Sequence, residues 1–125
     1  MIAHAIPTGK PLILCVDDSE SQLWLRTKVL EKNGFSVLTA TTASKALQWM
    51  RQAAVSLVLS DHMLGGTTGT ELAAELKKIS PNVPFVLYSG APPPTMQNVD
   101  CFILKGEPVE SFLAMLRDLV NRSRR

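Results

Sequence analysis

Five polar side chains stand directly after apolar stretches of this sequence. Asp17 and Asp18 follow the run LCV, and Asp61 follows the run LVLS. Ser89 and Lys105 follow two later apolar runs in the same way. Three carboxylates brought together repel one another unless a cation lies between them, and Mg²⁺ prefers hard oxygen ligands together with water. The residue types therefore predict a magnesium site, provided that the fold assembles them.

The rest of the chain alternates between strand and helix patterns. Short apolar runs bounded by turn residues predict buried strands at 11–16, 35–40, 56–60, 85–88 and 101–104. Between them, Ser19 with Gln22 and Thr68 with Glu71 form capping boxes that predict helix starts. Such alternation is typical of an α/β fold with a doubly wound parallel sheet.

The remaining helices are predicted from apolar spacing. A helix is expected at 43–51, and the one that starts at Thr68 should reach about residue 78. The residues expected to face the core are Leu23, Leu25, Val29 and Leu30 in the first helix and Val109, Phe112, Leu113, Leu116, Leu119 and Val120 in the last. Pro108 suits the first turn of that last helix.

This architecture gives the polar residues a common location. In an open α/β sheet, ligands bind beyond the carboxyl ends of the strands. Asp17 and Asp18 follow the first predicted strand and Asp61 the third, while Ser89 and Lys105 follow the fourth and fifth. We therefore expect all five at one edge of the sheet, with the carboxylates forming a metal site.

Composition and charge exclude several classes of protein. A formal charge of +2 is too small to indicate binding to nucleic acid. No apolar run approaches the roughly 18 residues that a membrane span needs. The first ten residues lack the charged start and long apolar core of an export signal. We expect a cytoplasmic protein with no nucleic-acid or membrane partner.

The length of 125 residues suits one domain. We expect an N-terminal tail at 1–10, the folded domain at 11–122 and a basic C-terminal tail at 123–125. Cys15 and Cys101 share no metal-binding spacing, which favours reduced, buried thiols.

With these residues in place, the sequence resembles the response-regulator receiver domain of two-component signalling. The resemblance covers about residues 11–121 and rests on VDD at 16–18, Asp61, Gly69 eight residues beyond it, YSG at 88–90 and FILK at 102–105. Each motif alone is weak, but the ordered set at successive strand ends is specific. The resemblance implies a flavodoxin-like sheet with strand order 2-1-3-4-5.

The resemblance also implies a phosphoryl-accepting site. Asp61 would accept a phosphoryl group from a phosphohistidine on a sensor histidine kinase or a phosphotransfer protein. Asp18 and Asp61 would bind Mg²⁺, and Asp17 would act mainly through a metal-bound water. The backbone carbonyl of Met63 would complete the protein ligands.

Three further residues receive roles from the resemblance. Lys105 would neutralise one phosphoryl oxygen and the Ser89 hydroxyl would hydrogen-bond another. Ser89 drawn toward the phosphoryl group would vacate space into which Phe102 rotates, and this movement reports the phosphorylation state in the family. Hydrolysis of the acyl phosphate would reset the switch.

Several of these residues have ordinary interpretations as well. Ser89 alone is typical of a turn, and Phe102 is as consistent with a plain core residue as with a moving one. His62 has no second histidine or cysteine at metal spacing, so we expect a solvent-facing loop residue. In this interpretation, Asp17 and Asp18 form a polar strand end, and Asp18 helps to cap a helix.

Two other functions stay open at this point. A degenerate receiver would act as an interaction module without phosphorylation. A small Mg²⁺-dependent phosphohydrolase is disfavoured, because such enzymes need an Asp-x-Asp on the first strand and a cap that excludes water. Because the last predicted helix reaches the end of the chain, we expect a stand-alone signalling receiver, not an enzyme, that contacts an unknown protein target.

The largest departure from the family pattern is GAPPPTMQNVD at 90–100. The family has a complete helix here, but three consecutive prolines leave too few residues for a mean helix of about 11. We expect this fourth helix to be missing or reduced to one turn. We also expect a monomer, since the usual dimer face includes that helix. A second departure is Gly106, which stands where a proline is usual.

Overall fold

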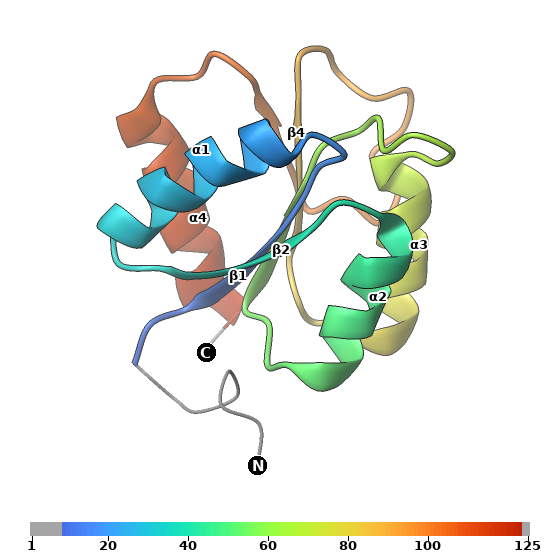
Figure 1. Cartoon of the computed structure of the whole chain (residues 1–125), viewed down its shortest axis with the longest axis horizontal. Coiled ribbons are helices and arrows are strands. Elements are labelled where there is room, and N and C mark those ends of the chain that lie inside the picture. The colour runs from blue at the N-terminus through green and yellow to red at the C-terminus, as the bar shows by residue number, and fades with distance from the viewer. Residues whose placement is uncertain (1–8, 124–125) are drawn as a thin grey trace.

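A parallel sheet lies between two pairs of helices in the computed structural model, which describes residues 9–123 (Figure 1). The elements in chain order are β1 (Leu12–Val16), α1 (Glu20–Lys32), β2 (Ser36–Ala40), α2 (Ala43–Gln52), β3 (Leu57–Ser60), α3 (Gly69–Ile79), β4 (Phe85–Ser89), β5 (Cys101–Leu104) and α4 (Val109–Ser123). The strands are parallel and take the order β2-β1-β3-β4-β5. The predicted α/β fold and strand order are confirmed.

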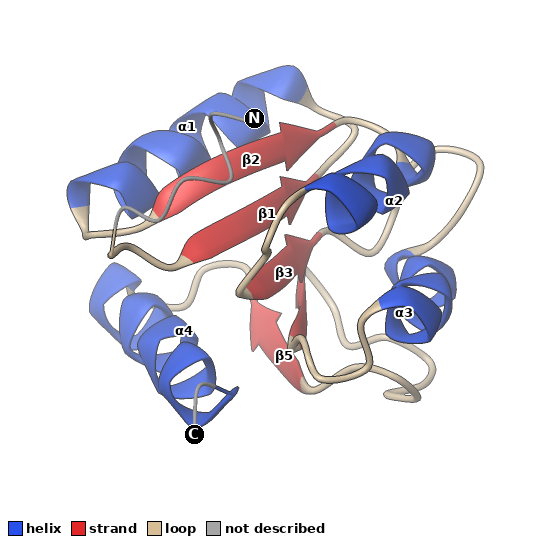
Figure 2. Cartoon of the chain, turned by 90° about the horizontal axis from the view of Figure 1, so that it is seen from below, coloured by secondary structure: helices blue, strands red, loops and turns tan. Residues whose placement is uncertain are grey.

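The central strands β1, β3 and β4 are mostly buried on both faces of the sheet, whereas the edge strands β2 and β5 are only partly buried. Ile13 and Cys15 of β1 pack in a cluster with residues of α1 and α4, and Leu14 and Val16 pack in a second cluster with residues of α2 and α3. Figure 2 shows these two helix pairs on opposite sides of the sheet. Burial on both faces explains why the strands read as unbroken apolar runs instead of alternating ones.

The predicted helix starts are confirmed. The Ser19 hydroxyl accepts a hydrogen bond from the Gln22 amide at 3.3 Å, and the Thr68 hydroxyl accepts one from the Glu71 amide at 3.3 Å. Thr42 caps α2 in the same way by accepting a hydrogen bond from the Lys45 amide, although no capping box marks this helix start in the sequence. Strand ends lie within one residue of the predicted ones.

Two residues that were predicted to face the core, Leu25 and Val109, are exposed instead. Leu25 is 54% exposed, whereas its neighbour Arg26 is buried at 7% exposure. In α4, Val109 is exposed, while Phe112, Leu116 and other members of the stripe are buried. Leu25 lies in the second turn of α1, and Val109 is the first residue of α4. At both positions, a difference of one residue in helical phase turns a side chain from the core to solvent.

Residues 90–100 connect β4 to β5 without a helix, as predicted. The segment consists of bends and turns, and three consecutive prolines withhold the backbone donors that a helix needs. The next helix along the chain, α4, begins only after β5. The N-terminal tail expected at 1–10 and the basic tail expected at 123–125 lie mostly outside the described residues, although Ser123 ends α4.

Cys15 and Cys101 are both free thiols. They lie on β1 and β5, which β3 and β4 separate in the sheet. Burial raises the pKa of the Cys15 thiol to about 12, so this thiol stays protonated at neutral pH. No helix within residues 9–123 combines the length and the apolar character of a membrane span.

An acidic side chain fixes the end of the helix-free segment. The Asp100 carboxylate accepts hydrogen bonds from the Phe85 amide and from the Lys77 ammonium group, both at 2.7 Å. The Asp100 amide in turn donates to the Phe85 carbonyl at 2.9 Å. Lys77 also donates to the Val83 carbonyl at 2.8 Å. These contacts tie the start of β5 to the start of β4 and to α3.

We therefore expect Asp100→Ala to destabilise the fold. The substitution leaves the partly buried Phe85 amide without its side-chain acceptor, which costs about 1–3 kcal/mol of unfolding free energy. Denaturant unfolding measures this loss, and hydrogen exchange should show faster exchange of the Phe85 amide.

Glu75→Ala is a matched control, because Glu75 pairs with Lys78 at 2.7 Å on an exposed helix face. Its expected effect is below about 1 kcal/mol. Equal losses in the two variants would contradict a special role of Asp100.

Candidate functional site

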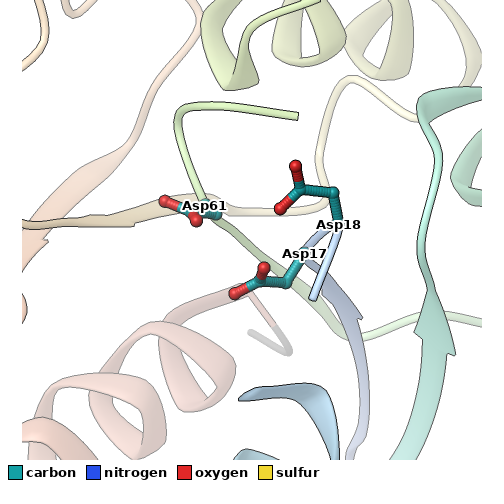
Figure 3. Close-up of side chains that lie close together, drawn as sticks. All are labelled: Asp17, Asp18 and Asp61. Carbon is teal, nitrogen blue, oxygen red and sulfur yellow. The ribbon is translucent and has the colours of Figure 1, made fainter. Parts of the chain in front are cut away.

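Three carboxylates meet where β1 and β3 end (Figure 3). The parallel pairing of Val16 with Ser60 continues through a 2.9 Å hydrogen bond from the Asp61 amide to the Val16 carbonyl. This register brings Asp61 beside Asp17 and Asp18. Each of the three residues offers a carboxylate oxygen, and these oxygens all lie within 4.8 Å of one another. The sequence prediction that these residues come together is confirmed.

Asp61 is held from two sides. One oxygen accepts the His62 backbone amide at 2.8 Å, and the other lies 3.3 Å from the Lys105 ammonium group. Lys105 reaches Asp61 from the end of β5, and its own amide donates to the Ser89 carbonyl at 2.8 Å. The side chain of Asp61 keeps 17% exposure, so the carboxylate is fixed and still open to a small reactant.

Asp17 and Asp18 differ sharply in their surroundings. Asp18 is exposed, whereas Asp17 is buried at 1% exposure. One oxygen of Asp17 accepts the Ser19 amide at 2.9 Å, and the other lies 3.3 Å from a guanidinium nitrogen of Arg26. Asp18 is therefore the carboxylate of this pair that solvent reaches.

Arg26 and Tyr88 belong to the site and were not predicted from the sequence. The Arg26 guanidinium lies 4.9 Å from the centre of the Tyr88 ring, and the Lys105 ammonium group lies 5.8 Å from it. The sequence does carry a signal, because Arg26 falls at helical spacing between the buried Leu23 and Leu30. A charged residue at such a position indicates a buried partner.

Ser89, Phe102 and Met63 were also predicted to belong to the site, and their roles stay predictions. Ser89 ends β4 and is half-buried. Phe102 is half-buried in β5 and packs against the α2/α3 cluster. Met63 lies in the loop after Asp61 with its side chain 64% exposed. The prediction that His62 faces solvent is wrong, since it is half-buried and its Nδ1 atom lacks a hydrogen-bond partner within the described part of the chain.

The backbone conformation at Gly106 explains why this chain has no proline after Lys105. It follows Lys105 with a φ of +102°, and proline is restricted to a φ near −65°. The backbone after the lysine therefore takes a path in this chain that proline cannot follow.

Gly69 packs against the backbone of Asp61. A Cβ atom added at Gly69 would lie 2.6 Å from the Asp61 carbonyl oxygen and 2.5 Å from a methyl group of Leu87. The Gly69 amide also donates to the His62 carbonyl at 2.6 Å. The eight-residue spacing between Asp61 and Gly69 thus closes the loop tightly onto the end of β3.

We expect Gly69→Ala to destabilise the protein by about 1–3 kcal/mol, because neither a backbone carbonyl nor a fully buried leucine can yield easily. Chemical denaturation measures the loss. Gly90→Ala is the control, since a Cβ atom at Gly90 meets nothing within 4 Å. A Gly69→Ala variant as stable as the wild type would contradict the close packing.

Comparison with known proteins agrees with the fold. The family model of the response regulator receiver domain matches residues 13–104. CpdR, a response regulator receiver protein of Brucella abortus, is 30% identical over 112 residues, which cover 90% of this chain and 92% of CpdR. The chain belongs to the response regulator receiver family. Receiver domains of this family act in two-component signalling.

Other relatives are longer or share only the fold. The transcriptional regulatory protein GlrR of Escherichia coli is 28% identical over 117 residues, but the chain spans only 26% of its length. A CheY-like receiver domain protein from Methanospirillum hungatei superposes with a TM-score of 0.83 at 24% identity, covering 92% of this chain and 97% of that one. The response regulator TrrA of Thermotoga maritima, solved in complex with Mg²⁺-BeF, gives a TM-score of 0.81 at 22% identity and covers 87% and 98%.

Proposed function

We propose that the protein accepts a phosphoryl group on Asp61 in a Mg²⁺-dependent reaction and signals through protein contacts. The observation that carries this proposal is the position of Asp61. Its carboxylate lies within 4.8 Å of oxygens of Asp17 and Asp18 and 3.3 Å from the Lys105 ammonium group. An acceptor, a cluster of metal-ligand oxygens and a fixed cation therefore adjoin one another.

The donor set fits Mg²⁺. The clustered side chains offer oxygen atoms only, and the exposed Asp18 leaves room for the water ligands that this ion retains. Asp18, Asp61 and the backbone carbonyl of Met63 would hold the ion, with Asp17 acting through water. TrrA, which has the same fold, was solved with Mg²⁺-BeF, and this supports a Mg²⁺ site in this chain. Bound Mg²⁺ supplies neutralisation of negative charge on the phosphoryl oxygens.

The chain's own residues supply nucleophile and orientation. An oxygen of Asp61 attacks the phosphorus of a phosphohistidine, forming an oxygen–phosphorus bond while the nitrogen–phosphorus bond breaks, and the histidine nitrogen leaves with the electron pair. Lys105 stabilises the charge that develops on the transferred group, and Ser89 donates a hydrogen bond to it. Positioning contributes most of the rate in such transfers, because little acid or base chemistry is needed.

The partner that supplies the phosphoryl group is a sensor histidine kinase or a phosphotransfer protein. A groove of about 290 Å³ beside the site is lined by residues that include Leu25, Lys105 and Val109. Trp24, Leu25 and Val109 are 61%, 54% and 55% exposed. Exposed apolar side chains of this size favour a protein as the docking partner.

Signalling would start at Ser89 and Phe102. Movement of Ser89 toward the phosphoryl group would let Phe102 turn inward. Because residues 90–100 carry no helix, this movement would reorganise a segment of turns instead of shifting a rigid helix.

Phosphorylation is tested with acetyl phosphate and Mg²⁺, followed by intact mass measurement. We expect the wild type to gain one phosphate and Asp61→Asn to gain none, because the amide oxygen is a poor nucleophile. Asp118→Asn is a matched control, since Asp118 pairs with Arg122 on an exposed face of α4. Labelling of the Asp61 variant at the wild-type level would place the phosphate elsewhere. An unlabelled wild type would favour the degenerate interaction module.

Binding of Mg²⁺ should also stabilise the folded protein. An ion that binds only the folded state adds about 1.4 kcal/mol at roughly tenfold its dissociation constant. We expect Asp18→Asn to lose most of this gain, because it removes the exposed carboxylate of the site. Thermal unfolding with and without millimolar MgCl₂, with NaCl at matched ionic strength, measures the effect. A melting temperature indifferent to Mg²⁺ contradicts the proposed metal site.

A further inference from the structure

A buried cation adjoins the acidic site from α1. The Arg26 side chain is only 6% exposed, and its guanidinium group forms an ion pair with Asp17 at 3.3 Å. Removing a guanidinium group from water is costly unless a partner compensates for it. Asp17 supplies the opposite charge, and the Tyr88 ring lies 4.9 Å from the guanidinium carbon.

Contacts on several sides hold Arg26 in this position. Tyr88 packs against Phe112 of α4 with ring centres 5.1 Å apart. Leu23 and Leu30, three positions before and four after Arg26 on the same helix face, are buried in the core. Arg26 is therefore a fixed charge and not a mobile surface group.

Asp17 is the carboxylate of the site that faces inward. Its two oxygens accept hydrogen bonds from the Ser19 amide and from Arg26, and the residue is 1% exposed. Asp61 has a cation of its own in Lys105 at 3.3 Å. Two cations thus already offset much of the charge of the three carboxylates without a metal ion.

This arrangement has a consequence for metal binding. Lys105 belongs to the phosphoryl site, but Arg26 approaches only Asp17 among the three carboxylates. A positive charge in contact with Asp17 repels a divalent cation bound close by, and burial limits the screening of this repulsion by salt. The same charge offsets repulsion among the carboxylates when no metal is present.

We propose that Arg26 is a resident counter-ion of the acidic site, which keeps Asp17 in place without metal and lowers the affinity of the site for Mg²⁺. The proposal rests on the Mg²⁺ site of the proposed function. Arg26 is a positioning residue, because it acts on the metal through Asp17. The protein would consequently require a higher Mg²⁺ concentration than the same site without Arg26.

The test is isothermal titration of the full chain with MgCl₂ at constant ionic strength. Arg26→Gln removes the charge but keeps a hydrogen-bond donor for Asp17, and we expect it to bind Mg²⁺ about tenfold more tightly or better. Arg26→Lys keeps the charge and should bind close to the wild-type affinity. Lys28→Met removes an exposed charge from the same helix and should leave the affinity unchanged.

A purely structural role for Arg26 predicts a different result. The melting temperature without Mg²⁺ would fall in Arg26→Gln, but the dissociation constant for Mg²⁺ would stay within twofold of the wild type or rise. Either result overturns the proposal. If Arg26→Gln fails to fold, Arg26→Met takes its place, because it also removes the charge and keeps a long side chain. Unchanged or weaker Mg²⁺ binding by Arg26→Met then overturns the proposal, and tighter binding supports it.

Mg²⁺ binding by the wild-type protein distinguishes failure of the proposed role of Arg26 from failure of the proposed metal site. Measurable Mg²⁺ binding by the wild type with no gain in Arg26→Gln overturns the role of Arg26 alone. Binding by Arg26→Gln without detectable binding by the wild type supports it in its strongest form. Absence of binding in both proteins overturns the metal site and the role of Arg26 together.

Discussion

Repulsion among three carboxylates at the ends of β1 and β3 is the constraint that the structure has to satisfy. Backbone amides of Ser19 and His62 each bind one carboxylate oxygen, and Lys105 and Arg26 add positive charge from β5 and α1. Ser19 and His62 follow β1 and β3 directly, whereas Lys105 comes from the end of the edge strand β5 and Arg26 from α1. The acidic cluster therefore depends on the complete strand order, because a sheet without β5 would lack its lysine.

Because the site needs Lys105 from β5, the helix-free segment at 90–100 has to hold β5 in register with β4. Lys105 follows the last residue of β5, and Asp100 precedes the first. The hydrogen bonds between Asp100 and Phe85 fix the start of β5 against β4, so the register that results carries Lys105 to Asp61 at the other end of the strand. In this chain a carboxylate and Lys77 hold the strand where a helix would otherwise pack.

Much of this organisation could be predicted from the sequence, since it follows from local patterns. Apolar runs located the strands, and hydroxyl caps such as Ser19 located helix starts. The carboxyl ends of parallel strands lie at one edge of the sheet, and this rule predicted that Asp61 and Lys105 lie close together. Pairing between distant residues was not predictable, because a charge at Arg26 or Asp100 does not identify its partner along the chain. Helical spacing also could not decide which of Leu25 and Arg26 enters the core.

The position of Ser89 connects the site to two different environments. Its neighbour in β4, Tyr88, packs on the α1/α4 side against Phe112 and beneath Arg26. Phe102 in β5 faces the α2/α3 cluster together with Val99 from the segment that lacks a helix. A displacement of Ser89 would therefore act on the packed Tyr88, Phe112 and Arg26 side chains on the α1/α4 side. On the α2/α3 side it would act on a segment of turns. Because close-packed groups transmit small shifts better than turns do, we expect the α1/α4 side to be the stiffer of the two connections between Ser89 and the surface.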